Sequence, residues 1–282
     1  MKRIWIWAAV LLLLAGCAAG GDAGSSSGVL APSSSAPGAQ SPTLREESEQ
    51  AMENGQSGEP QEPETAPPEN AEPEISGEEA PVLLYMGQAS MRVVTPEGKV
   101  IYIDPYAGDA YDLPADLILV THGHFDHCAV DKVVDRAPDC RIITHEEAVM
   151  DGVHQSFSLP YVTVEAVEAG YNPWHDVNRC AGYVLTFTNG KSVYVTGDTS
   201  TTEQMPLLAE KEIDYAFFCC DGLFNMGLEE AARCAEMVWA KHNIPYHNTT
   251  DNTGEMFDRE LAEQFGAPDR LIVFPGEELL VE

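Results

Sequence analysis

Hydrophobic residues recur in short runs from residue 82 onward, separated by glycine, proline and other turn-forming residues. The runs are rich in valine, isoleucine and aromatic side chains, which is typical of strands, and they are too short for helices. The predicted strands are residues 82–87, 90–94, 100–104, 116–120, 141–144, 162–167, 180–187, 192–196, 215–218 and 271–274. Asn189 and Gly190 form a hairpin turn between two of these strands.

Three other stretches have helix patterns. Residues 129–134 indicate the start of a helix, residues 202–210 a second helix, and residues 228 to about 242 a third. Strands come first, strands and helices then alternate, and this order occurs twice. Such an order predicts an α/β domain in which two sheets pack together with helices on both outer faces.

The first residues have the pattern of an export signal. Lys2 and Arg3 precede an apolar run over residues 4–14, which is shorter than the roughly 20 residues of a membrane-spanning helix. Residues 14–17, Leu-Ala-Gly-Cys, are similar to a bacterial lipobox, so we expect a signal peptide over 1–16 and a lipid on Cys17. Two or more acyl chains would anchor the exported protein stably to the outer face of a bacterial cell membrane. An ordinary cleaved signal with an incidental cysteine is the alternative.

Residues 17–80 differ sharply in composition from the rest of the chain. Serine, glycine, proline, glutamate and glutamine dominate, and 13 acidic residues accompany one base, Arg45. Such a segment cannot bury enough apolar surface to offset the entropy lost on ordering, so it is predicted to be a disordered tether. The remaining residues, 81–282, are sufficient for one domain with its own core.

Acidic residues also dominate the predicted domain. The whole chain has a formal net charge of −31, and residues 81–282 contain 33 acidic and 12 basic residues. This balance argues against nucleic acid as a partner, because phosphate backbones are bound by lysine and arginine.

Six cysteines remain besides Cys17. An exported domain could pair some of them, but the sequence does not define which. Several have the surroundings of core residues, and metal ligation by Cys128 or Cys219 is a further alternative.

The loop at residues 121–128 carries the main candidate chemistry. His122, His124, Asp126 and His127 lie within six residues, directly after a predicted buried strand. Side chains alternate in an extended loop, so His122 and His124 project the same way, whereas Asp126 and His127 can face a second point nearby. This arrangement suits two metal ions, although a polar surface loop is the simpler alternative.

The spacing His-x-His-x-Asp-His resembles the signature of the metallo-β-lactamase-fold hydrolases. The resemblance implies a four-layer αββα sandwich with its site along one edge of the two sheets. It also implies that Asp198, in a Gly-Asp-Thr segment, bridges two metals and that His247, behind the third predicted helix, binds the second one. Asp198 could instead cap the next helix.

The resemblance implies one more histidine for the first metal, between the histidine-rich loop and the Gly-Asp-Thr segment. The candidates are His145, His154 and His175. His145 comes soon after the loop and could help to cap a helix, while His154 lies in a loop of its own. His175 follows predicted strand 162–167, as the family pattern requires, and residues 171–175 resemble a subgroup close to the ascorbate-phosphate lactonases. His175 is therefore the predicted ligand.

Two further segments border the expected site. The resemblance makes Asp104 a partner of a metal-bound histidine, although an Asp-Pro turn would explain it equally well. Residues 221–227 match a glycine-rich family loop beside the pocket, and Phe224 within it could line the substrate site or belong to the core.

Together these residues predict a metal-dependent hydrolase. One ion would be held by His122, His124 and His175, the other by Asp126, His127 and His247, with Asp198 and a water between them. Imidazole and carboxylate ligands suit zinc, and manganese or iron would also be tolerated. A bridging hydroxide would attack a small lactone, ester or phosphodiester, with Asp126 orienting it or taking its proton. The alternative is a surface lipoprotein of the same fold that binds one metal or a ligand without turnover.

Overall fold

The computed structural model describes residues 80–282. The predicted signal peptide (1–16), the predicted lipidation site Cys17 and the predicted tether up to residue 79 lie outside the described residues. Within the described part of the chain, no helix is both long enough and apolar enough to cross a membrane.

The first half of the domain forms a six-stranded sheet with the strand order β14-β1-β2-β3-β4-β5. Its strands are β1 (Val82–Gly87), β2 (Ser90–Val94), β3 (Val100–Ile103), β4 (Ala115–Leu119), β5 (Arg136–Ile143) and β14 (Glu278–Leu280). The strands β1, β2 and β3 form an antiparallel meander, whereas β3, β4 and β5 run parallel. The last strand of the chain thus returns to the edge of the first sheet, beside β1.

The second half forms another six-stranded sheet with the order β13-β12-β11-β10-β9-β8. Its strands are β8 (Ser156–Leu159), β9 (Val162–Glu168), β10 (Ala181–Phe187), β11 (Ser192–Val195), β12 (Tyr215–Cys219) and β13 (His242–Tyr246). The strands β8 to β11 are antiparallel, and β11, β12 and β13 run parallel. A short hairpin, β6 (Val149–Met150) with β7 (Val153–His154), precedes this sheet.

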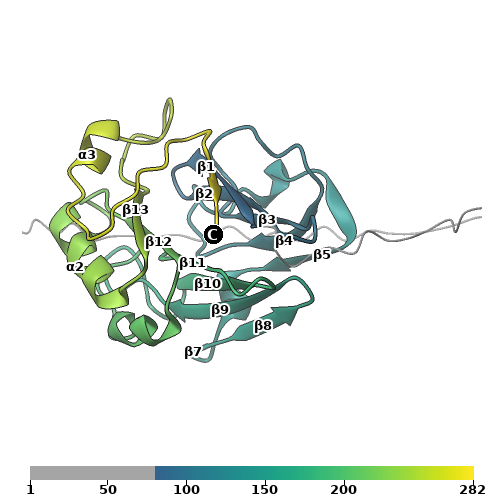
Figure 1. Cartoon of the computed structure of the whole chain (residues 1–282), viewed down its shortest axis with the longest axis horizontal. Coiled ribbons are helices and arrows are strands. Elements are labelled where there is room, and N and C mark those ends of the chain that lie inside the picture. Colours follow the sequence, from purple (N-terminus) through teal and green to yellow (C-terminus); the bar gives the residue numbers. More distant parts are fainter. Residues whose placement is uncertain (1–79) are drawn as a thin grey trace, which may run out of the picture. The chain divides into compact units, whose positions relative to one another are not determined.

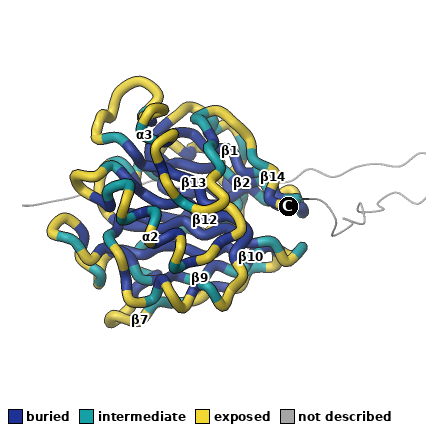
Figure 2. Tube along the Cα trace, turned by 60° about the vertical axis from the view of Figure 1, so that its left-hand side comes forward, coloured by how far each residue is buried: buried dark blue, intermediate teal, exposed yellow. Residues whose placement is uncertain are grey.

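The two sheets enclose one large hydrophobic core. On β4, Leu117 and Leu119 belong to this core, whereas Ile118, together with Val120 directly after the strand, belongs to a second cluster on the opposite face. This alternation is the period of two that an extended strand imposes. Figure 2 shows the buried strands through the middle of the domain and exposed residues mainly in the connections.

The outer faces of the two sheets have different covers. On the second sheet, α2 (Leu228–Val238) buries one stripe, at Ala231, Cys234, Ala235 and Val238. Figure 1 shows α2 and α3 (Arg259–Glu263) on the side of β12 and β13. On the first sheet, the single 3-10 turn η1 (Val130–Lys132) and the loop between β3 and β4 pack over the outer cluster. The predicted two-sheet α/β sandwich is therefore confirmed, with a thin cover on the first sheet.

Most predicted strands are confirmed to within two residues, but the strand predicted at 141–144 begins five residues earlier and the predicted helices are shorter than expected. The stretch 129–134 contains only η1, because β5 begins at Arg136 and leaves room for one turn. The stretch 202–210 contains the 3-10 helix η2 (Met205–Lys211), with a proline in its first turn. The helix predicted to reach residue 242 ends at Val238, because Trp239 adopts a left-handed backbone with φ 56°.

The strand predicted at 271–274 is wrong. This segment has no strand conformation, and its hydrophobic side chains lie partly buried against the core. Only Leu271 donates a backbone hydrogen bond to the neighbouring strand, at Asn243. The apolar run therefore reflects packing of a loop, and a few residues later β14 forms the actual edge strand.

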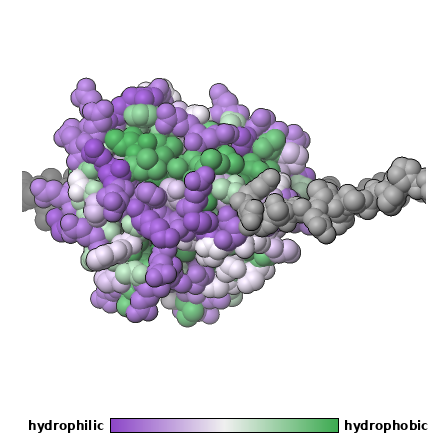
Figure 3. Space-filling view, in the orientation of Figure 1, coloured by the Kyte–Doolittle hydropathy of each residue, from purple (hydrophilic) through white to green (hydrophobic). Residues whose placement is uncertain are grey.

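Figure 3 shows a strip of hydrophobic residues across the upper part of an otherwise mostly hydrophilic face of the domain.

Candidate metal centre

The candidate residues lie where the carboxyl ends of the parallel strands meet. Asp104 follows β3, and the loop 121–127 follows β4. In the second sheet, Asp198, Asp221 and His247 follow β11, β12 and β13 respectively. Parallel strands bring their carboxyl ends to one edge of a sheet, and in α/β folds ligands bind at such edges. The topology therefore gathers residues that are far apart in sequence.

Asp104 organises the start of the histidine-rich loop. It is fully buried, and its carboxylate accepts the Thr121 backbone N–H at 2.8 Å and the Thr121 hydroxyl at 2.7 Å. The same carboxylate lies 2.8 Å from His127 Nδ1. A proton on Nδ1 then leaves the lone pair of His127 on Nε2, the nitrogen that faces the site.

His175 joins the first two histidines of the loop. Ligand nitrogens of His122, His124 and His175 all lie within 4.8 Å of one another. His175 Nε2 lies 3.2 Å from His124 Nδ1, and Asn172 Oδ1 lies 3.0 Å from His175 Nδ1 on the opposite side of the ring. The Asn172 side chain thereby fixes the orientation of a ring that the sequence could assign only by its position after a strand.

The other two histidine candidates lie outside this cluster. His145 is the first residue of α1 (His145–Ala148) and lies against Gly123, and His154 ends β7. Neither belongs to a metal-type cluster among the described residues, and neither does a cysteine. The N-cap of that helix is Thr144, and no side chain caps the helix at this end.

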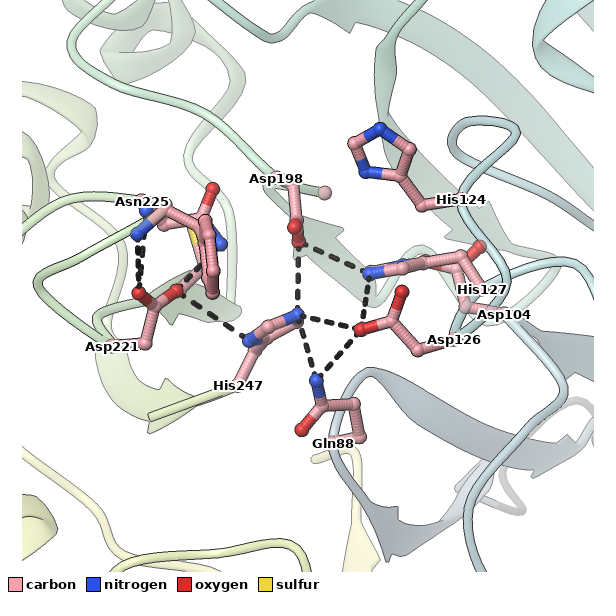
Figure 4. Close-up of polar contacts among 12 residues, drawn as sticks. Gln88, Asp104, His124, Asp126, His127, Asp198, Asp221, Asn225 and His247 are labelled. Carbon is pink, nitrogen blue, oxygen red and sulfur yellow. Dashed lines mark hydrogen bonds and ion pairs between the residues drawn. The ribbon is translucent and has the colours of Figure 1, made fainter. Parts of the chain in front are cut away.

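Asp198 lies beside His127 and His247 (Figure 4) and also faces His175. One carboxylate oxygen lies 3.3 Å from His175 Nε2, and the other lies 3.3 Å from His127 Nε2 and 3.4 Å from His247 Nε2. The alternative role as a helix cap is wrong, because the next helical segment begins only at Met205, with Gln204 as its N-cap. A single carboxylate thus faces both halves of the site.

His247 and Asp126 form the remaining corner. Asp126 Oδ2 lies 3.9 Å from His247 Nε2, and the Gln88 amide nitrogen lies 2.9 Å from Asp126 Oδ2 and 3.1 Å from His247 Nε2. Behind the ring, Asp221 Oδ2 lies 3.7 Å from His247 Nδ1. The Asp221 side chain is itself fully buried and accepts the Asn225 amide at 2.7 Å (Figure 4).

Three site residues have an unfavourable backbone conformation. Gln88, Asp104 and His247 have φ values of 48°, 45° and 41°, in the left-handed region that glycine favours. Tertiary contacts must offset this strain, and strained residues of this kind concentrate at functional sites. Each of the three side chains contacts a proposed ligand or is one.

The charges at the site are strongly coupled. Burial alone would raise the pKa of Asp198, but the nearby His247 and His127 outweigh it and hold the pKa well below its ordinary value. Burial alone would lower the pKa of His127, yet Asp198 and Asp104 raise it well above its usual range. For His122, burial and then the positive charge of His127 lower the pKa well below normal. The carboxylate is therefore ionised and its charge is available to cations.

Several ligand atoms are buried without a hydrogen-bond partner. They are His122 Nε2, His127 Nε2 and Asp198 Oδ1. Leaving buried polar atoms unpaired is costly, so such atoms need an explanation. Three overlapping clusters have the spacing of metal ligands: His122, His124 and His175; His122, His127 and Asp198; and Asp126, His127 and His247. The residues present therefore fit metal ions.

The structure brings together all seven residues predicted as ligands, and Asp104 contacts His127 as expected. It adds residues whose roles the sequence left unassigned: Gln88, Asn172 and Asp221. Asp221 could have been found by its position, because it follows a parallel strand as Asp198 does. Gln88 lies in the turn between β1 and β2, far from any motif, and no sequence signal connects it to the site.

A cavity of about 380 Å³ opens beside the centre. Asp126, His175 and Asp198 are among its lining residues, together with three aromatic side chains, Phe125, Trp174 and Phe224. Phe224 is 39% exposed, so the alternative that places it in the core is wrong.

Comparisons with known proteins agree with this geometry. The family model described as the beta-lactamase superfamily domain matches residues 82–247. A UPF0173 metal-dependent hydrolase from Rubrobacter xylanophilus is 30% identical over 230 residues, which cover 70% of this chain and 95% of that protein. A UPF0173 metal-dependent hydrolase from Thermodesulfovibrio yellowstonii is 26% identical over 245 residues, and the match covers 71% of this chain and 92% of that protein.

Solved structures have the same architecture. A protein from Parabacteroides distasonis, described as a metal-dependent hydrolase, superposes with a TM-score of 0.55 at 29% identity, covering 68% of this chain and 92% of that one. A metallo hydrolase from Ignicoccus hospitalis superposes with a TM-score of 0.57, and the match covers 72% of this chain and 99% of that one. Because the two sequences are only 19% identical, this likeness supports the fold alone.

Fold, site and comparisons together define a metal-dependent hydrolase of the beta-lactamase superfamily. Within that superfamily, the chain belongs to the UPF0173 metal-dependent hydrolase family.

Proposed function

We propose that this hydrolase uses two divalent cations, zinc by preference and manganese or iron as substitutes, to cleave a small lactone, ester or phosphodiester. The observation that carries the proposal is the position of Asp198. Its two oxygens face His175 on one side and His127 and His247 on the other, at 3.3–3.4 Å. A carboxylate shared in this way suits a pair of cations.

The chain offers a separate ligand group for each cation. His122, His124 and His175 would hold one, Asp126, His127 and His247 the other, and Asp198 both. The buried atoms of His122, His127 and Asp198 that lack a hydrogen-bond partner support this assignment. When bound, two such cations would supply a water of lowered pKa and would stabilise negative charge on the reacting oxygens.

The neighbouring side chains keep the ligands oriented. Asp104 holds the ring of His127 at 2.8 Å, and Asn172 holds that of His175 at 3.0 Å. Asp126 lines the cavity, is 14% exposed and is steered by the Gln88 amide. It is therefore the group that can orient an attacking water or accept its proton. The substrate would enter from the aromatic-lined cavity.

The lactonase-like branch of the superfamily remains part of the proposal. It is supported by the Tyr-Asn and Trp-His pairs at residues 171–175, in which Asn172 contacts His175. A binding protein without turnover would be favoured by an absent third imidazole on the first ion. Because His175 lies beside His124, the contacts support turnover instead.

The experiment that tests the proposal measures hydrolysis by metal-loaded and chelated protein. The panel consists of chromogenic lactones, aryl esters and phosphodiesters, and Asp126→Asn is the variant. We expect hydrolysis of at least one class, which the chelator abolishes and which the variant reduces. Protein that holds two metals and cleaves nothing in the panel would contradict the proposal.

We also propose that the mature protein is exported and anchored through lipid on Cys17. The lipobox-like sequence and the acidic segment behind it support this placement. The partners would be a small-molecule substrate and the membrane, without nucleic acid. Radiolabelled palmitate should enter the wild-type protein and not Cys17→Ser, and a soluble, unlabelled wild-type product would contradict the anchor.

A further inference from the structure

We propose that the site prefers an uncharged carboxylic ester or lactone whose acyl portion carries an aryl group, and that this group packs against Trp174. This inference rests on the proposed hydrolase function and narrows its substrate class. It disfavours a phosphodiester.

The walls of the cavity expose an unusual amount of aromatic surface. Trp174 is 57% exposed, Phe125 65% and Phe224 39%, and all three line the cavity that contains His175 and Asp198. Only two other aromatic residues of the described chain are similarly exposed, Tyr171 and Trp239. Exposed apolar surface that gathers around a cavity is typical of a ligand site.

The aromatic residues also have a defined arrangement. The rings of Trp174 and Phe224 meet edge to face, with centroids 5.4 Å apart and an interplanar angle of 80°. Phe125 packs in the same way against Tyr106, at 5.6 Å and 84°. Rings held by such contacts form firm walls, against which a flat apolar group gains both buried area and aromatic contact.

Trp174 is also close to the chemistry in sequence. It directly precedes His175, and the backbone N–H groups of both residues donate to Asn172 Oδ1 at 3.0 Å. One turn therefore positions both the indole and the imidazole. A substrate group that packs on Trp174 is fixed relative to the ligand cluster.

The charge of the cavity disfavours anionic substrates. Its lining, as the described residues define it, includes no lysine or arginine, and its acidic members are Asp126 and Asp198. Thr249, Thr250 and Asn252 add only uncharged hydrogen-bonding groups. An anionic substrate, a phosphodiester included, would meet no side-chain cation there and would depend on the bound metal ions alone to offset its charge. The excess of acidic over basic residues in the domain would repel anions at longer range as well.

Arg179 defines the competing possibility. It lines a neighbouring cavity of about 190 Å³, which shares His124 and Trp174 with the main one. Asp176 lines the same small cavity and opposes its charge. An anionic substrate that reached past Trp174 would depend on Arg179, and this dependence can be measured.

The proposed reaction is hydrolysis of the bond between the acyl carbon and the ester oxygen. Water adds its oxygen to the acyl carbon, the bond from that carbon to the ester oxygen breaks, and the leaving oxygen takes a proton. The products are a carboxylic acid and an alcohol, or one hydroxy acid from a lactone.

Metal-loaded full-length protein is tested with three chromogenic substrates that share a leaving group. They are 4-nitrophenyl phenylacetate, 4-nitrophenyl acetate and bis(4-nitrophenyl) phosphate. We expect the phenylacetyl ester to exceed the acetyl ester in kcat/KM by at least about 10-fold, the lower end of discrimination by pocket contacts, and the phosphodiester to react more slowly than both. Equal turnover of the two esters, or a preference for the phosphodiester, would overturn the proposal.

Variants then assign the preference to the cavity wall. In Trp174→Ala we expect about a 10-fold loss of kcat/KM for the phenylacetyl ester, mainly through KM, and less than about a twofold loss for the acetyl ester. Trp174→Phe should restore much of the loss, Trp239→Ala should behave as wild type, and all variants should keep wild-type metal content. An equal loss for both esters, or phosphodiester turnover that requires Arg179 when tested in Arg179→Gln, would contradict the proposed role.

A binding measurement separates this inference from the proposed function. In chelated Trp239→Phe protein, Trp174 is the only tryptophan in residues 80–282. We expect phenylacetamide to change its fluorescence saturably and phenyl phosphate to leave it unchanged. This result, combined with no hydrolysis of any substrate, would refute the function and retain the neutral aryl site. The reverse binding preference would refute the site itself.

Discussion

The two halves of the molecule contribute to the metal centre in different ways. The first sheet supplies His122, His124, Asp126 and His127 from one loop after β4. The second sheet supplies its three residues from separate loops, after β9, β11 and β13. A local motif is enough to identify the first half of the site. The second half exists only because β9, β11 and β13 run in the same direction in the folded sheet and end at one edge.

The supports behind the ligands differ as well. In the first half, a buried carboxylate lies 2.8 Å from the ring of His127. In the second half, His175 contacts a neutral amide at 3.0 Å, and the carboxylate of Asp221 lies 3.7 Å from His247. Direct contact with a charged partner orients a ring and raises its basicity more strongly. The first half should therefore be the less tolerant of change.

The largest expected effect comes from the residue that joins the two halves. Asp198→Asn keeps the size of the side chain but removes its charge. We expect a loss of metal together with a fall in kcat/KM of about 10²- to 10³-fold, as for removal of one main charge-stabilising group. Metal analysis and steady-state kinetics would measure it, and a variant that kept full metal and activity would disprove the bridging role.

The supporting carboxylates give the next largest effect and compare the halves directly. We expect Asp104→Asn to weaken metal affinity or activity by about 10- to 100-fold, the usual cost of losing such a partner. Asp221→Asn should cost less, near the lower end of that range, because its contact is longer. Competition with a fluorescent chelator would rank them, and the opposite order would reject the asymmetry.

A substitution at Gly197, directly before Asp198, is expected to destabilise the fold because the Ala181 backbone lies close to it. Gly197 has a φ of 62°, and a Cβ there would lie 2.8 Å from the Ala181 backbone oxygen. We expect Gly197→Ala to reduce the free energy of unfolding by about 1–3 kcal/mol. Gly190→Ala is the matched control, since its φ is 82° but an added Cβ meets nothing within 4 Å. Equal losses in urea unfolding would show that only the backbone angle matters.

The first half of the site could be predicted from the sequence more completely than the second half. Alternation of apolar residues identified most strands, and the loop motif identified four ligands, because both are local. Asp198, His247 and His175 were assigned through the family resemblance, His175 because it follows a predicted strand as the family pattern requires. The roles of Gln88 and Asn172 could not be identified from the sequence. Both residues are positioned by turns, and no sequence spacing reveals that these turns lie at the site.

The wrong element boundaries have the same origin. The helix pattern beyond residue 128 gives only the single turn η1, because β5 begins at Arg136 and leaves no room for a longer helix. The apolar run at 271–274 packs on the core without a ladder, and periodicity alone does not distinguish the two cases. In both segments, tertiary packing determined the conformation of the backbone.

The smallest expected effect concerns thiol reactivity. Each of the six cysteines in residues 80–282 is free, and Cys128, at the end of the histidine-rich loop, is exposed. In the second half, burial raises the pKa of Cys180 to about 12 and that of Cys219 well above its ordinary value. We expect a maleimide near pH 8 to label Cys128 first and Cys219 only on unfolding, as peptide mass spectrometry would show. Early labelling of Cys219 would mean that the strand ends of the second half open readily.

The most direct measurement is the number of metal ions per chain, determined by elemental analysis of the purified protein and of its His175→Ala variant. We expect two ions in the wild type and a value falling toward one in the variant, because His175 belongs to only one of the two ligand groups. A wild type with a single ion, or a variant that still holds two, would contradict the two-cation centre proposed here.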